Sequence, residues 1–462
     1  MSGTRIEEDS FGTIEVPLRA LWGAQTQRSL HFFAIGEQGM PPPLVHAMAQ
    51  VKRAAALVNA ELGLLNPAKA SAIADAALQV AAGEHDAQFP LSMWQTGSGT
   101  QSHMNMNEVL ANLASLALGG GLGSERWVHP HDDVNLGQSS NDVFPTAMHM
   151  VVALRMPALL AALQRLRLAL QARAHAWADL IKVGRTHLQD ATPVTLGQEF
   201  DAYDAQLALV ETVLLQAQPA LHALAIGGTA VGNGLNTHPA FGERVVQVLA
   251  TQLGLPFTVA ANRLAATAGH EALVALHSAF RLLAVALTKL GSDLRLMGSG
   301  PRAGLGEINL PANEPGSSIM PGKVNPTQVE ALLMVCQQVM GHDVAVGIAG
   351  AQGQFELNTG KPLIAFNLLD SQRLLTDAIT GLAAHCVEGL TANAERLQWQ
   401  LDRSLMGVTA LSPHIGHERA ARIAQHAQAH GLTLREAALK AGGLSAAEFD
   451  TWVDARRMLA PG

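Results

Sequence analysis

Three stretches of the chain repeat leucine and other apolar residues at intervals of three or four positions. They run from Leu159 to Trp177, from Phe200 to Leu214, and from Leu273 to Leu294. This spacing places the apolar side chains on one face of an α-helix. We therefore predict long helices over these stretches, the first beginning near Asp142. Two further helices are predicted from about 325 to 348 and from about 355 to 388.

Helices of this length carry more apolar surface than one small domain buries. They are expected to form an extended bundle and, with the faces left over, an oligomer. Shorter helices and polar, Gly-rich turns precede them, and short helical pieces at 392–404, 416–430 and 434–441 follow, the last with a possible capping box from Thr433 to Glu436. We predict an all-α chain with an N-terminal helical domain at 1–137, a central helix bundle at 138–388 and a small C-terminal helical domain at 389–462.

Composition supports the helical prediction and narrows the function classes. Aromatic residues make up 4 % of the 462 positions, and alanine and leucine dominate, which favours helix over sheet. The net charge of −8 disfavours nucleic acid or an anionic membrane as the main partner. The chain has only two cysteines, Cys336 and Cys386. Two are too few for a disulfide framework, a four-cysteine zinc site or the usual ligation of an iron–sulfur cluster.

The start of the chain and its apolar stretches predict a location. The first nine residues are acidic and lack the apolar region of a signal peptide, and organelle transit peptides are poor in acids. Charged or polar residues interrupt the long apolar stretches, so no membrane span is predicted. The sequence therefore predicts a cytoplasmic protein.

Four polar segments punctuated by glycine interrupt the apolar background, and each is predicted to lie at a helix end. They are 96–108, 138–142, 184–190 and 316–326, the last followed by Glu330 and containing Asn325 as a predicted N-cap. Ser, Thr and Asn side chains beside the free N–H groups of a helix N-terminus make an anion-binding surface. Taken singly, such a segment is more often an ordinary cap or turn. Together, and with His187 and Lys323 among them, they predict a site for a small anion.

The run 316–325, Gly-Ser-Ser-Ile-Met-Pro-Gly-Lys-Val-Asn, resembles the signature G-S-S-x-M-P-x-K-x-N of the fumarase/aspartase superfamily. Finer detail resembles the class II fumarases: Gly322 lies inside the signature, and His187 stands where aspartases typically carry glutamine. Segments 94–102 and 139–142 agree with this, and the resemblance extends from Asp9 to Asp450, nearly the whole chain.

The resemblance implies a three-domain all-α fold whose central five-helix bundle assembles into a homotetramer around a twenty-helix core. Each active site would draw on three subunits. It also implies reversible hydration of fumarate to (S)-malate by anti addition through a carbanion-like aci-carboxylate intermediate, with no metal or other cofactor. Such chemistry needs a base for a C–H beside a carboxylate, donors that hold that carboxylate, and an acid for the departing hydroxyl.

By motif position, Ser317 would be the base, supported by Lys323, and His187 paired with Glu330 would be the acid or water activator. Accounts of the family differ on how Ser317 and His187 divide these roles. The residues implied to bind the dicarboxylate are Ser98, Gly99, Thr100, Ser139, Ser140, Asn141, Thr186, Ser318, Lys323 and Asn325.

The family's second, peripheral dicarboxylate site is matched by Arg126, His129, His131 and Asp132. This chain departs from the family in having histidine at 131 and at 103, where asparagine is usual, and at Leu136-Gly137. Because histidine gains charge in acid, we predict that anion affinity at the second site changes between about pH 6 and 8. The histidines at 103, 129, 131 and 149 could be taken for metal ligands, but we favour the simpler interpretation that they are solvated or capping residues.

Two alternatives remain open. An aspartase-type ammonia lyase is the nearest enzymatic rival, and His187 and Gly322 count against it. A catalytically silent helical scaffold is the other, but such a scaffold has no reason to keep Ser317, His187, Lys323 and Glu330 together.

Overall fold

The computed structural model describes residues 3–461, and helices dominate this part of the chain. It forms two compact units that interleave along the sequence. Unit 1 comprises Met1–Leu159, Thr212–Leu282 and Gln337–Leu375, and unit 2 comprises Leu160–Glu211, Leu283–Cys336 and Thr376–Gly462. The predicted all-α class is confirmed, whereas the boundaries after residues 137 and 388 stay predictions.

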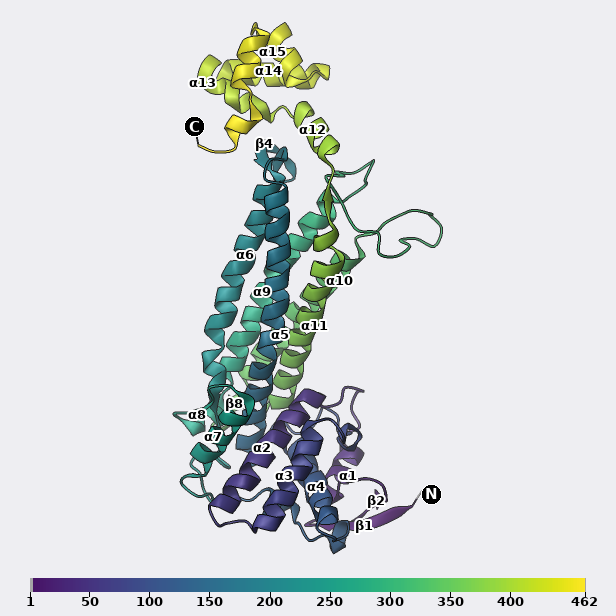
Figure 1. The fold of residues 1–462 in the computed structure, drawn as a ribbon, viewed down its shortest axis with the longest axis vertical. Helices are drawn as coiled ribbons and strands as arrows, with labels where there is room; N and C mark the ends of the chain where they lie inside the picture. Colours follow the sequence, from purple (N-terminus) through teal and green to yellow (C-terminus); the bar gives the residue numbers. More distant parts are fainter. Residues whose placement is uncertain (1–2, 462) are drawn as a thin grey trace. The chain divides into compact units, whose positions relative to one another are not determined.

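Five long helices contribute residues to both units, and within each unit their segments run side by side (Figure 1). They are α5 (Ser140–Ala176), α6 (Leu196–Ala217), α9 (Glu271–Met297), α10 (Thr327–Gly350) and α11 (Lys361–His385). The leucine stripes are buried as predicted: Leu163, Leu207 and Leu287 are each at most 1 % exposed. In unit 2 the Trp177 ring meets Phe200 edge-on, with 4.8 Å between centroids, and so fixes the end of α5 against α6.

Two helix starts differ from the prediction. Helix α11 begins at Lys361 because the preceding residues form the hairpin of β8 (Gly353–Gln354) and β9 (Leu357–Asn358). Helix α10 begins at Thr327, so Asn325 is not its N-cap; the Asn325 side-chain amide instead donates to the Gly316 carbonyl. Glu330 consequently lies in the first turn of α10.

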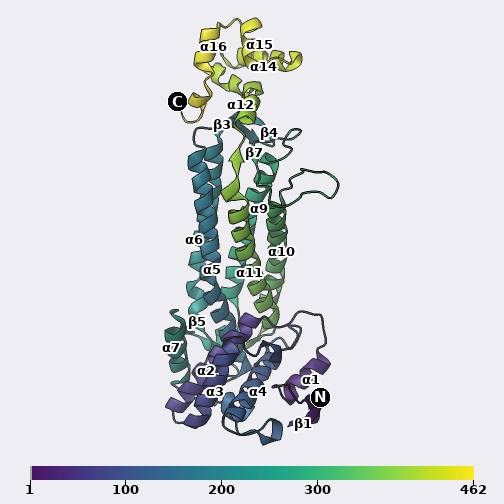
Figure 2. The same ribbon diagram turned by 45° about the vertical axis from the view of Figure 1, so that its right-hand side comes forward.

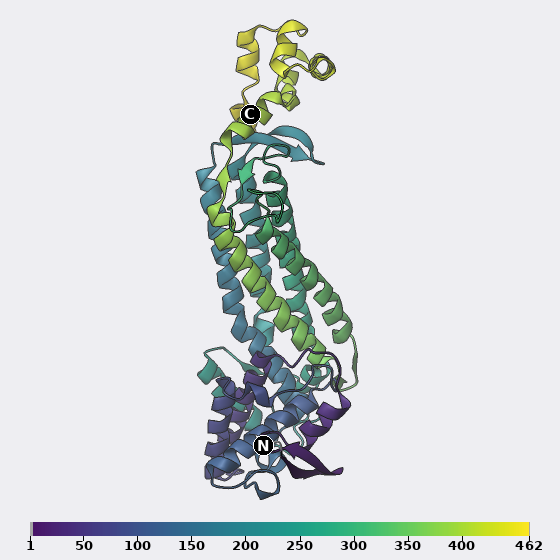
Figure 3. The same cartoon turned by 90° about the vertical axis from the view of Figure 1, so that its right-hand side faces the viewer.

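The remaining α-helices of unit 1 are shorter than these five, and the earliest of them in the chain, drawn in purple and blue, gather near the N-terminal strands (Figure 3). These remaining helices are α1 (Ala24–Phe32), α2 (Pro42–Glu61), α3 (Pro67–Ala81), α4 (Thr100–Ala117), α7 (Phe241–Leu253) and α8 (Arg263–Ala268). The antiparallel hairpin of β1 (Thr4–Asp9) and β2 (Gly12–Pro17) precedes them and was not predicted. Its turn depends on Gly12, whose φ is 103°. A short parallel pair, β5 (Ala223–Leu224) with β6 (Thr258–Val259), completes this unit.

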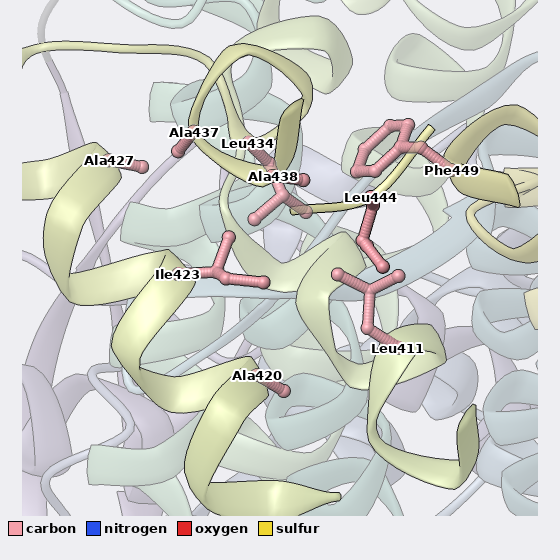
Figure 4. Close-up of a cluster of buried hydrophobic side chains, with 9 residues drawn as sticks. All are labelled: Leu411, Ala420, Ile423, Ala427, Leu434, Ala437, Ala438, Leu444 and Phe449. Atoms are coloured by element: carbon pink, nitrogen blue, oxygen red, sulfur yellow. The ribbon is translucent and has the colours of Figure 1, made fainter. Parts of the chain in front are cut away.

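Unit 2 contains the hairpin of β3 (Ile181–Thr186) and β4 (Gln189–Thr195), and the pair of β7 (Ile308–Asn309) with β10 (Thr391–Ala392). Five short helices follow: α12 (Ala394–Arg403), α13 (Ser412–Ile415), α14 (His417–His430), α15 (Leu434–Lys440) and α16 (Ala446–Trp452). Leu411, Ile423, Leu434 and Phe449 pack into one buried cluster there (Figure 4). Capping boxes begin α15 at Thr433, as the sequence indicated, and α16 at Ser445.

By length and composition alone, α5, α9 and α10 are apolar enough to cross a membrane. The prediction that charged or polar residues exclude any such stretch is therefore wrong. Burial inside the protein accounts for much of this character in α5 and α9, whose apolar windows are 61 % and 50 % buried. The window of α10 is only 28 % buried. Helix α10 thus keeps an uncovered apolar face within the single chain.

Candidate active site

The N-termini of α4 and α5 meet in unit 1 and bring the first two predicted segments together. Ser98 Oγ lies 2.7 Å from Thr100 Oγ1, and Thr100 Oγ1 lies 2.8 Å from Ser140 Oγ. The first N–H groups of a helix have no partner inside the helix, and the helix dipole makes this end positive. Two such ends with three hydroxyls between them form a surface suited to a carboxylate.

Two glycines make the turn before α4 possible. A Cβ on Gly97 would lie 1.5 Å from the Thr359 carbonyl oxygen, so no larger residue fits there. Gly99 has a φ of 77°, in the left-handed region, and a Cβ would strike the Phe144 ring. Gly99 therefore shapes the turn that presents Ser98 and Thr100.

Asp142 holds the turn before α5. Its Oδ1 accepts from the Ser139 N–H at 3.0 Å, and its Oδ2 accepts from the N–H groups of Gly227 and Thr229 at 3.0 and 2.9 Å. Burial raises the pKa of Asp142 to about 6, against the effect of these hydrogen bonds. Ser139 Oγ accepts in turn from the Asn141 N–H at 3.2 Å. The order of Ser139, Ser140 and Asn141 thus depends on one buried carboxyl group.

A fully buried lysine, not foreseen from the sequence, lies behind this turn. Lys52 Nζ donates to Gln138 Oε1 at 2.9 Å and to Asn135 Oδ1 at 3.0 Å, and lies 2.7 Å from His103 Nε2. Burial lowers the pKa of Lys52, and burial together with Lys52 lowers that of His103. His103 is therefore a buried partner of a lysine, not the solvated or capping residue of the sequence interpretation. No pattern distinguishes Lys52 from the apolar run of α2 that surrounds it.

His187 occupies the tip of the β3–β4 hairpin in unit 2, so the third segment does not lie at a helix end as predicted. Thr186 pairs with Gln189, which leaves His187 and Leu188 as a two-residue loop with φ of 56° and 60°. Positive φ at both positions is the geometry that Asn-Gly usually adopts in such a hairpin. For other residues it costs about 1–2 kcal/mol each, and strain of this kind is concentrated at functional sites. His187 and Thr186 are both exposed.

Ser317 lies in a loop of unit 2 that backbone hydrogen bonds close. The Gly316 N–H donates to the Lys323 carbonyl at 3.0 Å, an approach so close that a Cβ on Gly316 would lie 2.2 Å from that oxygen. Ser317 Oγ accepts from the N–H groups of Ile319 at 3.3 Å and Met320 at 3.0 Å. Two donors on one hydroxyl oxygen favour negative charge there.

The structure therefore gathers the predicted residues in two places. Unit 1 holds Ser98, Gly99, Thr100, Ser139, Ser140 and Asn141, whereas unit 2 holds Thr186, His187, Ser317, Ser318, Lys323, Asn325 and Glu330. Ser318, Lys323 and Glu330 are exposed, as is His187. The pairing of His187 with Glu330 stays a prediction.

The predicted second site lies in unit 1, where His131 and Asp132 belong to the helical turn Pro130–Val134 and His129 caps it. His129 Nδ1 accepts from the Asp132 N–H at 3.2 Å, and His131 Nε2 lies 2.9 Å from Gln25 Nε2. The Arg126 guanidinium is already paired with the buried carboxylate of Glu7. Burial and the neighbouring His129 lower the pKa of His131, so its charging moves to a more acidic range than the sequence suggested.

The metal interpretation finds no geometric support in residues 3–461, where no cluster of three or more His, Cys, Asp or Glu side chains is arranged to hold an ion. His129 and His131 are neighbours, with 5.9 Å between their ring centroids, whereas His103 and His149 are hydrogen-bonded to other groups. His149 Nδ1, for example, lies 3.1 Å from the Leu221 carbonyl oxygen.

Comparison with known proteins shows to which family the chain belongs. The sequence model of a lyase family matches residues 12–341, and that of the fumarase C C-terminus matches residues 408–460. Fumarate hydratase class II of Chromobacterium violaceum is 61 % identical over 450 residues, which cover 97 % of this chain and 98 % of that protein. The chain belongs to the class II fumarate hydratase family. The member from Nitrosomonas europaea is 56 % identical and is matched over 99 % of both chains.

Solved structures of the family agree with the fold. A class II fumarase from Schistosoma mansoni superimposes with a TM-score of 0.95 at 45 % identity, over 99 % of each chain. A fumarate lyase:delta crystallin from Brucella melitensis, bound to cobalt, gives 0.94 at 42 % identity over 99 % of this chain and all of that one. The predicted resemblance to class II fumarases and the assignment as a lyase are thus confirmed.

Proposed function

We propose that this class II fumarate hydratase family member catalyses the reversible hydration of fumarate to (S)-malate. The observation that carries the proposal is the meeting of two helix N-termini, at which Thr100 Oγ1 and Ser140 Oγ lie 2.8 Å apart. A carboxylate there would receive hydroxyl and backbone N–H donors while facing the positive ends of two helix dipoles. A substrate with a carboxylate at each end suits a site whose other half supplies a cation.

Two groups of donors would share the dicarboxylate. One carboxylate would bind at the α4 and α5 N-termini, through Ser98, Thr100, Ser139, Ser140 and Asn141, with Gly99 shaping the turn. The other would bind to donors of unit 2, namely Thr186, Ser318, Lys323 and Asn325. Charge-assisted hydrogen bonds of this kind are the strong ones, which suits a small and highly charged ligand.

The chemistry follows from where negative charge must develop. When malate is the substrate, Ser317, as alkoxide, would take the proton from the carbon beside one carboxylate. The electron pair would move into that carboxylate to give the aci-carboxylate. The N–H groups of Ile319 and Met320, which point at Ser317 Oγ, and the Lys323 ammonium would stabilise the alkoxide.

His187, oriented by Glu330, would then protonate the departing hydroxyl from the opposite face of the substrate. Water and fumarate leave in this direction, and the same groups exchange roles in hydration. Because the proton and the hydroxyl would leave from opposite faces of the substrate, the elimination would be anti. No step needs a metal or another cofactor.

The complete site would belong to a homotetramer in which three subunits contribute to each active site. Met334, Val344 and Ile348 support this, because these apolar side chains of α10 are 64 %, 62 % and 61 % exposed in the single chain. Other copies covering the α10 face would account for its apolar character without a membrane, and the net charge of −8 disfavours a nucleic-acid partner, so we propose a cytoplasmic enzyme. Arg126, His129, His131 and Asp132 would form a second, peripheral dicarboxylate site.

A substrate panel tests the proposal. The purified protein is incubated with fumarate, (S)-malate, aspartate or mesaconate, with and without a metal chelator, and the fumarate double bond is followed by its ultraviolet absorbance. Conversion between fumarate and malate, unchanged by chelator, is expected. Fumarate formation from aspartate alone would instead identify an ammonia lyase, and no turnover of any of the four would identify a silent scaffold.

A further inference from the structure

A group of four charged side chains, two of them buried and two partly buried, lies under the hairpin that carries His187. Lys182 Nζ donates to both carboxylate oxygens of Glu199, at 2.9 and 2.8 Å, and lies 2.9 Å from Glu307 Oε2. Arg185 Nη1 donates to Glu307 Oε1 at 2.7 Å. Lys182 and Glu307 are 1 % and 0 % exposed. Two cations and two anions thus form a neutral group, as burial requires.

Glu307 is itself fixed to the scaffold of unit 2. Its N–H donates to the Met297 carbonyl at the end of α9, and its carbonyl accepts from the Asn393 N–H just before α12, both at 2.8 Å. The next residue begins β7, which pairs with β10. Figure 2 shows β3, β7 and α12 together in this part of unit 2, where Arg185 also reaches Gln400 Oε1 of α12 at 3.5 Å.

The contacts end immediately before the hairpin tip. Arg185 is followed by Thr186 and His187, and both side chains at the tip are exposed. The strand register slips between Val183 and Arg185, a bulge that increases local twist. Lys182 and Arg185, on either side of this irregularity, both reach the same carboxylate. Besides the pairing of β3 with β4, Glu307 therefore holds β3 on both sides of the bulge that precedes the tip.

We infer that Glu307 is a positioning residue for His187, acting through Lys182 and Arg185, which deepens and rests on the proposed function. Glu307 touches no reacting atom. It fixes the twist of β3, and β3 sets the direction in which His187 leaves the hairpin.

The test uses the single variants Glu307→Gln and His187→Asn and the double variant that carries both. Their kcat and KM are measured with fumarate and with malate as substrate. Misplacing a catalytic group by about 1 Å costs about 100-fold in rate. Glu307→Gln should therefore lower kcat about 100-fold and leave KM within about threefold, because only Thr186 among the proposed carboxylate donors lies on β3 and those of unit 1 are untouched. Circular dichroism and sedimentation at the assay temperature report whether the variant is folded and assembled.

The double variant separates positioning from general support. If Glu307 acts through His187, adding Glu307→Gln to His187→Asn lowers kcat no further, since residues that act as a unit are not additive. Multiplicative losses, or a Glu307→Gln enzyme with near wild-type kcat, would overturn the inference. Wild-type protein without any fumarate turnover would instead refute the proposed function.

Two further variants provide an independent test and a matched control. Arg185→Lys keeps the charge but loses the fork of the guanidinium, and it changes a position that is less buried than Glu307. It should show the same loss of kcat at unchanged KM, and a normal kcat would count against the inference even if Glu307→Gln fails to fold. Glu388→Gln, which breaks the exposed pair with Arg165 elsewhere in unit 2, is the matched control and should behave as wild type.

Discussion

Thr100 Oγ1 and Ser140 Oγ lie 2.8 Å apart although 40 positions separate the two residues in the sequence. The contact joins the first residues of α4 and α5, so it brings two helix N-termini to one point in unit 1. Neither hydroxyl is needed to begin its helix, because Gly99 precedes α4 and Ser139 supports the start of α5. Their proximity is the observation on which the proposed carboxylate site rests.

Removing one of these hydroxyls should weaken substrate binding more than chemistry. We expect Ser140→Ala to lower kcat/KM about 10- to 100-fold, mainly through KM, because a hydrogen bond to a charged group contributes about 1.5–3 kcal/mol. Initial rates over a range of malate concentrations measure it. Ser71→Ala, at an exposed position of α3, is the control, and equal kinetics of the two variants would contradict the assigned binding role.

The β3–β4 hairpin should not tolerate a side chain at its bulge. A Cβ on Gly184 would lie 2.4 Å from the Thr192 carbonyl oxygen on the facing strand. We expect Gly184→Ala to lower stability by about 1–3 kcal/mol and kcat about 100-fold, because the displaced strand carries His187. Gly39→Ala, where the nearest atom would be 3.9 Å away, is the control. An active and stable Gly184→Ala enzyme would show that the hairpin geometry does not matter.

Lys361 should make stability depend on pH in the alkaline range. Its side chain is fully buried, Nζ donates to the Asn358 carbonyl at 2.6 Å, and burial lowers its pKa to about 7. Above that pH the native chain has lost the proton while the unfolded chain, with a pKa near 10.5, still holds it. The free energy of unfolding therefore rises with pH across this window, by at most about 1.4 kcal/mol per pH unit.

Urea unfolding of the wild type and Lys361→Met at about pH 7, 8 and 9 measures this effect. The wild type should gain stability relative to the variant as the pH rises. Lys440→Met, at an exposed position, should show no such trend. Parallel pH profiles for the wild type and Lys361→Met would contradict a depressed lysine pKa.

The apolar face of α10 should control assembly. Val344 is 62 % exposed in the single chain, and an acid there would be buried if copies pack on this face. We expect Val344→Asp to sediment as smaller species and to lose activity with the assembly, because in the proposed tetramer each site draws on several copies. Leu78→Asp on α3, also at a half-exposed position, serves for comparison. A fully assembled Val344→Asp enzyme would place the interface elsewhere.

Much of the fold was predictable because the long helices carry clear periodicity. The leucine stripes located α5, α6 and α9 closely, and the Thr433 to Glu436 spacing located the start of α15. The β-hairpins were missed for physical reasons. His187-Leu188 carries none of the Asn or Gly that normally indicates a two-residue hairpin, and the β1 strand has charged residues at most positions.

The sequence motifs proposed the members of the candidate site, which stay predictions, but they gave nothing of its geometry. Motifs gave Ser98, Thr100 and Ser140, yet only the structure shows that their hydroxyls form one chain of hydrogen bonds. Lys52 and Glu307 were beyond reach, since a single charged residue in an apolar stretch reveals neither its burial nor its partners. Their importance depends on contacts between segments far apart in the sequence.

The most direct test of the account compares fumarate hydration by the wild type and by Ser317→Ala, with the assembly of both measured by sedimentation. The account predicts rapid, chelator-insensitive formation of malate by the wild type. It predicts a loss of at least about 100-fold in kcat for the variant, without change in assembly, because the base of the reaction is gone. A correctly assembled Ser317→Ala enzyme that hydrates fumarate at near the wild-type rate would contradict it.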